Sequence, residues 1–154
     1  MKKKQIVNPF YNAANTVLNN MFQIKVERRN IELKDNIITT KKANINIGVS
    51  GDLTGSVIYS FSESMALNIA AKMAGMEMNE LNELVGSAVG ELANIISGNA
   101  VTNLSKNNYQ CDIVPPEVIL GTGKNLLITV DNIISVSMNS DLGEFDINIS
   151  IENQ

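Results

Sequence analysis

The chain has 154 residues and a net charge of −4, with no histidine and a single cysteine, Cys111. This length suits one domain, and we expect residues 1–154 to form it. The negative charge argues against a general nucleic-acid-binding protein. Without histidine, the Ser-His-Asp and Cys-His mechanisms are excluded, and a zinc site would need a nearly all-carboxylate shell.

The N-terminal region predicts a helix and no membrane segment. No apolar run approaches the roughly 18 residues of a membrane-spanning helix. We therefore expect a cytoplasmic protein without a membrane partner. Asn8-Pro9 predicts a helix start, with Asn8 as N-cap and Pro9 in the first turn, and apolar residues then recur at helical spacing as far as Met21.

The next hundred residues predict strands, a short helix and a long helix. Alternation from Ile24 predicts a strand before the turn signal Asp35-Asn36, and residues 45–49 and 53–61 read as a hairpin. Ser62 should cap a second helix that ends near Gly75. Asn79 should open a long helix over about residues 80–106.

The C-terminal part predicts strands. A short strand over residues 109–114 precedes Pro115-Pro116, which should lie in a loop or at an edge. Three alternating segments follow, at 126–130, 134–138 and 145–151, with a turn at Asp131-Asn132, and the last could offer a sheet edge for pairing. The whole pattern predicts an α/β layered fold, a mostly antiparallel sheet packed by helices.

A short internal similarity suggests duplication. Residues 12–21 read NAANTVLNNM and residues 91–100 read ELANIISGNA. Aligned without gaps, Asn15 matches Asn94, and Asn12 stands where Glu91 stands. Similarity of this length between two helices is common, so it is only a hint.

The long helix carries a row of small and polar residues. Ser87, Glu91, Asn94 and Gly98 follow at steps of four, three and four, which places them on one side, away from an apolar stripe that should cover the sheet. Residues 86–103 contain no lysine or arginine. Each helical glycine costs about 1 kcal/mol relative to alanine, so close packing or a closely approaching partner should offset that cost. The row is either an ordinary solvated face or a functional surface.

Residues 90–100, GELANIISGNA, resemble the signature helix of the CheC/CheX/FliY chemotaxis phosphatases. The chain length and the Pro-Pro segment resemble the CheX-type members most. The resemblance implies an α/β sandwich with a pseudo-repeat, and a homodimer. It also implies one site at Glu91 and Asn94, because the first copy has Asn12 in place of the acid.

The implied activity is removal of the aspartyl phosphate from a CheY-like response regulator. Asn94 would orient the attacking water, Glu91 would pair with the regulator's lysine, and Ser87, Gly90 and Gly98 would contact the partner. The regulator would supply its own Mg²⁺, so no cofactor is expected on this chain. Two alternatives remain open: a non-catalytic binding or scaffold module of the same fold, in chemotaxis or motor-switch signalling, and a structural homo-oligomer packed through the glycine-rich helix.

Overall fold

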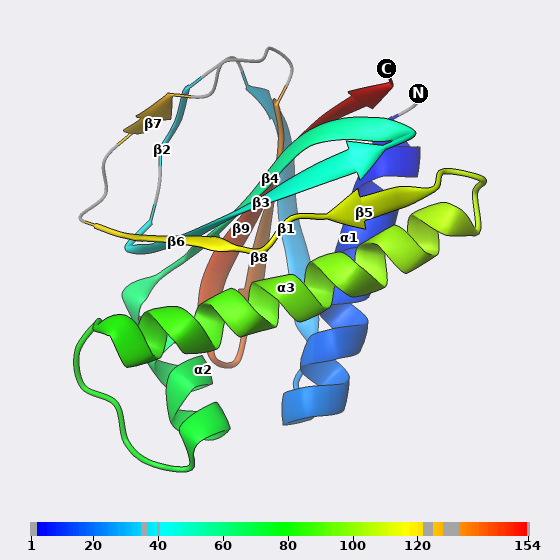
Figure 1. The fold of residues 1–154 in the computed structure, drawn as a ribbon. Helices are drawn as coiled ribbons and strands as arrows, with labels where there is room; N and C mark the ends of the chain where they lie inside the picture. Colours follow the sequence, from blue (N-terminus) through cyan, green and yellow to red (C-terminus); the bar gives the residue numbers. More distant parts are fainter. Residues whose placement is uncertain (1–2, 35–36, 40, 122–124, 128–132, 154) are drawn as a thin grey trace.

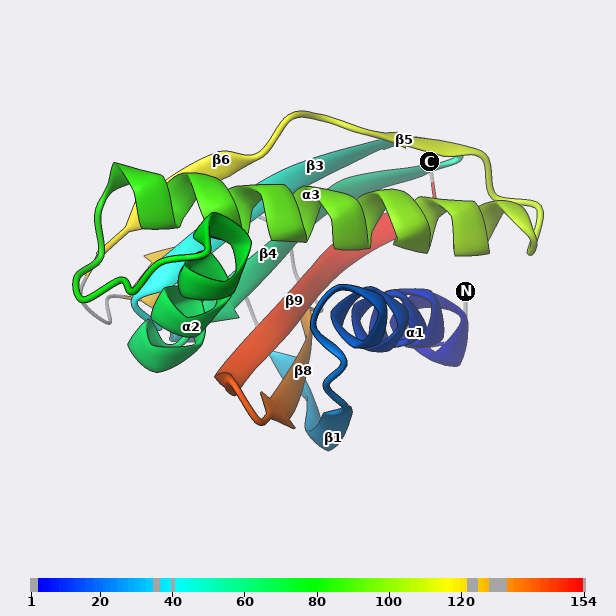
Figure 2. The same ribbon diagram turned by 90° about the horizontal axis from the view of Figure 1, so that it is seen from below.

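A computed structural model describes residues 3–34, 37–39, 41–121, 125–127 and 133–153. Within these residues, helices pack on one face of an antiparallel sheet, which confirms the predicted α/β layered fold. The helices are α1 (Lys3–Phe22), α2 (Glu63–Ala74) and α3 (Glu83–Ser105). Figure 1 and Figure 2 show α3 crossing the sheet, with α2 near its N-terminal half and α1 near its C-terminal half. Among the described residues, none of the helices combines the length and apolar character that a membrane span requires.

In the described residues the main sheet has seven strands in the order β1-β8-β9-β4-β3-β5, and β6 also pairs with β3. These strands are β1 (Val26–Lys34), β3 (Ala43–Gly51), β4 (Leu53–Phe61), β5 (Cys111–Ile113), β6 (Glu117–Leu120), β8 (Ile133–Ser140) and β9 (Gly143–Asn153). A separate two-stranded sheet joins β2 (Ile37–Thr39) to β7 (Asn125–Leu127). The predicted hairpin is therefore confirmed as β3–β4.

Strand β9 is central rather than peripheral. It lies between β8 and β4, so the segment 145–151 does not offer the sheet edge that the sequence suggests. The outermost strands are instead β1 on one side and β5 with β6 on the other. The predicted turns at Asp35-Asn36 and Asp131-Asn132, and residues 128–130 of a predicted strand, lie outside the described residues.

The order of the sheet is symmetric about the boundary between β4 and β9. Exchanging β3 with β8, β4 with β9, and β1 with the β5–β6 edge leaves every pairing unchanged. The same exchange relates α1 to α3, because each helix precedes its own set of strands. The likeness between residues 12–21 and 91–100 thus belongs to a duplication of the whole fold, in which α2 has no counterpart among the described elements.

Two prolines interrupt one edge of the sheet. β5 pairs with the end of β3 and β6 with its beginning, and Pro115 and Pro116 lie between them. Proline has no N–H to donate to a strand ladder, so the edge breaks there. The sequence does not predict β6, because four residues are too few to distinguish a strand from a loop. β6 bears on the site because Val118 lies against α3.

Helix α1 begins earlier than predicted. It starts at Lys3, so Asn8 is not its N-cap and Pro9 lies inside the helix. A proline there removes a backbone hydrogen bond. The preceding turn stays helical because Ile6 and Val7 are buried in the core, and this tertiary packing outweighs the local signal.

The caps of α2 are as predicted, and the cap of α3 is shifted. The Ser62 hydroxyl accepts from a backbone N–H of the first turn of α2, and Gly75 ends that helix with φ of 70°. For α3 the cap is Asn82 rather than Asn79, and its side-chain oxygen accepts from the Val85 N–H at 3.0 Å. Asn79 and Asn82 both lie near the start of α3, and either side chain could cap a helix, so the local sequence does not decide between them.

The core lies between the helices and the sheet. The inward side chains of the central strands alternate with polar ones on the helix-free face, and three aromatic rings stack in the middle. Tyr59 and Phe61 have ring centroids 6.5 Å apart, and Phe61 and Phe145 have centroids 5.6 Å apart. These rings belong to the same core cluster as the buried side chains of α2 and α3.

A buried hydrogen bond ties α3 to the sheet. The hydroxyls of Tyr59 on β4 and Ser97 on α3 lie 2.7 Å apart, and both side chains are fully buried. Burial raises the pKa of Tyr59 far above its ordinary value, so this phenol stays neutral. A second bond runs from the Asn103 amide to the Pro9 carbonyl of α1 at 3.2 Å. Together these bonds fix the rotation of α3 about its own axis.

We expect Tyr59→Phe and Ser97→Ala each to lower the free energy of unfolding by about 1–2 kcal/mol, because each leaves a buried hydroxyl without its partner. The double variant should lose less than the sum of the two single losses. Urea denaturation of the four proteins measures this coupling. Strictly additive losses would show that the bond does not hold α3.

Candidate functional site

Glu91 and Asn94 lie together on the outer side of α3. Glu91 is exposed and Asn94 is half-buried, with exposed Ser87 and half-buried Gly98 in the same row. Within the described part of the chain, neither Glu91 nor Asn94 makes a side-chain hydrogen bond or ion pair. The row that the sequence predicts therefore exists, and its acid and amide are available to another molecule.

The backbone beneath this pair is rigid. α3 runs for 23 residues, and Glu91 and Asn94 lie in its middle turns, far from either end. Residues three apart on a helix have Cβ atoms about 5–6 Å apart, so both side chains reach the same patch of a partner. A helical scaffold holds such a pair more accurately than a loop does.

The glycines of α3 differ in what surrounds them: two pack against β6, and one faces open space. A Cβ at Gly86 would lie 3.0 Å from Val118 Cγ1, and a Cβ at Gly90 would lie 3.2 Å from Val118 Cγ2. These two glycines let α3 approach β6 closely. A Cβ at Gly98 would have nothing within 4 Å, so packing inside this chain does not explain that glycine.

Gly90 and Gly98 therefore differ as candidate partner contacts. Gly90, which the sequence places on the partner-binding surface, is buried and faces β6 rather than the outer side. Gly98 lies in the row with Glu91 and Asn94 and leaves the helix surface open beside them. On the outer side of α3, Ser87 and Gly98 are thus accessible, whereas Gly90 is not.

Some apolar residues of α3 point outward rather than toward the sheet. Leu84 is 55% exposed and Ile95 is 36% exposed, although most apolar residues of α3 were expected to form one stripe on the sheet. The stripe is wider than the face that α3 buries, so its margins reach solvent. Leu84 borders a hollow of about 240 Å³ between α2 and α3. That hollow is lined by Ala70, Met73, Ala74, Leu84, Ser87, Ala88 and Glu91.

The duplicated position on α1 has a different setting. Asn12 is exposed and Asn15 half-buried, as are their counterparts Glu91 and Asn94. The neighbouring hollow is about 360 Å³ in volume and has a largely polar lining. It is lined by Asn15, Thr16, Asn19, Asn20, Lys25 and Val26. The two halves of the fold thus present the same helix face, but only α3 combines an acid with the amide.

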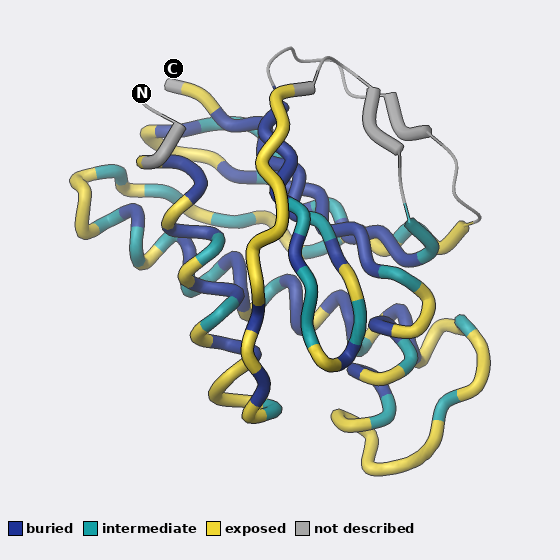
Figure 3. The backbone as a smooth tube through the Cα atoms, turned by 180° about the vertical axis from the view of Figure 1, so that it is seen from behind, coloured by how far each residue is buried: buried dark blue, intermediate teal, exposed yellow. Residues whose placement is uncertain are grey.

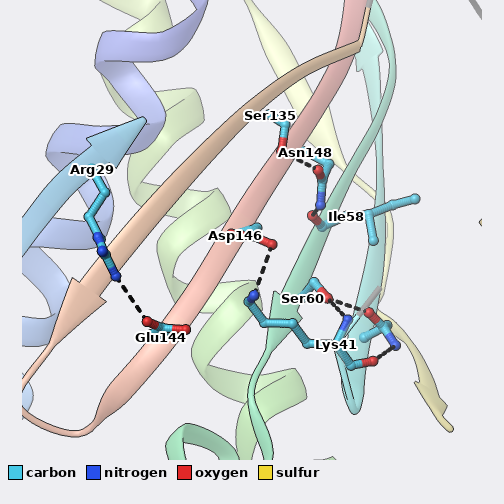
Figure 4. A network of polar contacts seen from close by, with 9 residues as sticks. Arg29, Lys41, Ile58, Ser60, Ser135, Glu144, Asp146 and Asn148 are labelled. Carbon is cyan, nitrogen blue, oxygen red and sulfur yellow. Dashed lines mark hydrogen bonds and ion pairs between the residues drawn. The ribbon is translucent and has the colours of Figure 1, made fainter. Parts of the chain in front are cut away.

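A second polar cluster lies on the helix-free face of the sheet (Figure 4). Arg29 pairs with Glu144 at 3.0 Å, and Lys41 pairs with Asp146 at 3.5 Å. Deeper in the sheet, buried Ser135 donates to Asn148 at 2.8 Å. These polar groups pair with one another, so we assign the cluster a structural role.

Among the described residues, no group of three histidine, cysteine, aspartate or glutamate side chains is arranged to hold a metal ion. The acid and amide on α3 are a polar pair without a hydrogen-bond or ion-pair partner among the described residues. Such a pair can accept from a partner's ammonium group and orient a small molecule such as water, but an amide cannot act as a strong base.

Comparison with known proteins gives consistent results. Residues 43–131, which include α3 with Glu91 and Asn94, match the family model described as chemotaxis phosphatase CheX. The chain is also similar to the CheY-P phosphatase CheX of Thermotoga maritima, with 36% identity over 126 residues. That match covers 79% of this chain and 76% of the relative.

Solved structures with the same fold cover nearly the whole chain. A CheC-like superfamily protein from Shewanella sp. PV-4 is 29% identical, with a TM-score of 0.89 over 99% of this chain and 100% of that one. A complex from Borrelia burgdorferi, described as CheX-CheY-BeF3-Mg²⁺, contains a similar chain. It is 29% identical, with a TM-score of 0.79 over 96% of this chain and 98% of that one.

We expect Gly98→Ala to raise the free energy of unfolding by up to about 1 kcal/mol, because alanine favours the helix and its methyl group meets no neighbour. Gly86→Ala is the matched control, and it should gain less or lose stability because its methyl group crowds Val118. Urea denaturation compares the two. A larger gain at Gly86 would contradict the packing account.

Proposed function

Because the chain belongs to the CheX family of chemotaxis phosphatases, we propose that it hydrolyses the aspartyl phosphate of a CheY-like response regulator. The observation that carries this proposal is the free acid–amide pair on the rigid outer face of α3. The name of the Thermotoga relative and the description of the Borrelia complex support the choice of substrate and partner.

In this proposal Asn94 positions water. Its amide enters the regulator's active site, and the side-chain oxygen accepts a hydrogen bond from a water in line with the phosphorus and the aspartyl oxygen. The water oxygen forms a bond to phosphorus while the bond to the aspartyl oxygen breaks. The products are inorganic phosphate and a free carboxylate, and the water's proton leaves to the phosphate or to solvent. Orientation in a near-attack geometry supplies the rate gain.

Glu91 docks the regulator. Its carboxylate lies on the same side of α3 as Asn94, so an ion pair with a lysine beside the regulator's phosphorylated aspartate places the amide over the phosphoryl group. The pair forms between two macromolecules and excludes some water, which strengthens it compared with an open surface pair. Exposed Ser87 and open Gly98 leave room on either side for the partner's backbone.

The metal that assists phosphoryl transfer comes from the partner in this scheme. Mg²⁺ on the regulator offsets the charge of the phosphoryl oxygens, and the solved Borrelia complex is described as containing Mg²⁺. This chain contributes no cofactor of its own. The family resemblance also implies a cytoplasmic homodimer, and light scattering of the purified protein tests the dimer.

Asn94→Ala should lower the phosphatase rate about 100-fold, because the water loses its orienting group. The fold should persist, since the Asn94 side chain makes no hydrogen bond within the described chain. Asn15→Ala is the matched control, because Asn15 has the same burial on the duplicated helix and should leave the rate unchanged. The measurement is the decay of phosphorylated regulator. Equal rates for Asn94→Ala and wild type would refute the assigned role.

Glu91→Gln should mainly weaken docking. We expect the regulator concentration at half-maximal rate to rise about tenfold, while the rate at saturation changes little. The wild-type affinity should fall with added salt more steeply than that of the variant, because the variant lacks the charge. A titration of the rate against regulator concentration at two ionic strengths measures both. Binding without any turnover by the wild type would instead favour a non-catalytic module.

A further inference from the structure

The hollow between α2 and α3 has an apolar floor that solvent reaches. Leu84 is 55% exposed and Met73 is 36% exposed, and both line the hollow. Met76, which follows α2, is 60% exposed. Large apolar side chains gathered in a hollow mark an interaction surface more often than isolated ones do. Methionine also adapts its shape to whatever packs against it.

An acidic segment, here called the acidic rim, joins the two helices that flank this hollow. The connection from α2 to α3, residues 75–82, and the first turn of α3 contain exposed Glu77, Glu80 and Glu83 and no lysine or arginine. One exposed cation, Lys72, lies in the last turn of α2, so the acids outnumber the bases in this region. None of the three glutamates forms an ion pair with the described residues. Figure 3 shows this connection as an exposed loop beside the helices. Glu91 lines the hollow itself, so acids occur both in its lining and in the segment that joins its two helices.

The duplication supplies an internal comparison. α2 has no counterpart beside α1 in the described chain, and the hollow next to Asn15 is largely polar, with Lys25 in its lining. The apolar hollow with acidic surroundings is therefore found at the half of the fold that keeps the acid–amide pair.

We propose that this hollow is the specificity pocket for the response regulator. It receives an exposed apolar side chain of the regulator that is flanked by lysine or arginine and lies beside the phosphorylation site. This inference rests on the proposed function and deepens it. The charge pattern indicates the kind of partner surface. An exposed apolar side chain of the regulator with basic residues around it would complement an apolar hollow with an acidic rim.

The dimensions of an interface support this occupant. Leu84 and Glu91 are seven residues apart, which is about 10 Å along a helix. A standard interface covers about 800 Å² on each partner, a patch close to 30 Å across. A regulator whose lysine reaches Glu91 therefore also covers Leu84. The apolar residues of the hollow, Leu84 and Met73, are separate from the acid–amide pair, so the hollow governs affinity rather than the rate at saturation.

The first test replaces the apolar floor. Leu84→Gln should raise the regulator concentration at half-maximal rate about tenfold and leave the saturated rate unchanged. Leu33→Gln is the matched control, because Leu33 is 54% exposed on β1, away from the hollow, and should change neither quantity. The probes are the CheY-like regulators of the same genome, phosphorylated with acetyl phosphate for rates and saturated with beryllofluoride and Mg²⁺ for binding.

The second test replaces the acidic rim. The double variant Glu77→Gln/Glu80→Gln should bind the beryllofluoride-saturated regulator more slowly, with a shallower dependence of the association rate on salt. The dissociation rate should change little, because rim charges act mainly on the encounter. An association rate equal to that of the wild type at low salt would overturn the charge part of the proposal.

The outcomes separate this inference from the proposed function. If the wild-type protein leaves the dephosphorylation rate of every phosphorylated regulator unchanged, the phosphatase proposal is wrong. A wild type that is active, with Leu84→Gln indistinguishable from Leu33→Gln, would sink only the specificity pocket. Light scattering of Leu84→Gln tests whether the hollow instead binds a second copy of this chain. A change in oligomeric state would show that it does and would overturn the proposal.

Discussion

The seating of α3 on the sheet is the constraint on which the rest of this molecule depends. The rotation of a helix about its own axis is fixed by its contacts with the sheet. Here two contacts fix it: a buried hydrogen bond between two hydroxyls, and the close packing of α3 against β6. Tyr59 on β4 meets Ser97 at 2.7 Å, and Gly86 and Gly90 allow α3 to lie against Val118 of β6. Once the inner side is fixed in this way, Glu91 and Asn94 must face outward together.

The fold is a duplication in which only one half combines an acid with the amide and has a second helix beside it. Pairwise exchange of strands leaves the sheet unchanged, and residues 12–18 of α1 and 91–97 of α3 have the same pattern of exposed, half-buried and buried positions. The symmetry is broken by Asn12 at the position of Glu91 and by α2, which packs beside α3. An acid, an amide and an apolar hollow therefore meet at one end of an otherwise repetitive scaffold.

The absence of histidine agrees with chemistry of this kind. An aspartyl phosphate is an acyl phosphate with a good leaving group, so hydrolysis needs an oriented water and offset charges rather than a strong base. In the proposed mechanism, a helix that presents an amide is sufficient because the partner brings the metal and the lysine. The small residues of α3 then have two separate physical roles: Gly86 and Gly90 serve internal packing, and Gly98 leaves clearance on the outer side.

Local signals predicted most elements of this fold but not all of their boundaries. The β3–β4 hairpin, the Ser62 and Gly75 caps of α2, and the position of Pro115-Pro116 at a sheet edge follow from turn, cap and ladder chemistry that acts over a few residues. The start of α1 did not follow, because buried Ile6 and Val7 keep a turn helical ahead of Pro9. The central place of β9 also did not follow, since strand order is a long-range property.

By itself, the sequence determined the residue types available for chemistry and the row on which Glu91 and Asn94 stand, because helical periodicity alone places them together. The tertiary structure decided which side of α3 is buried, and so which glycines pack and which stay open. It also decided that Leu84 borders a hollow rather than the core. These outcomes depend on β4, β6 and α2, segments distant in sequence from the residues they position, and no local pattern encodes where such segments meet.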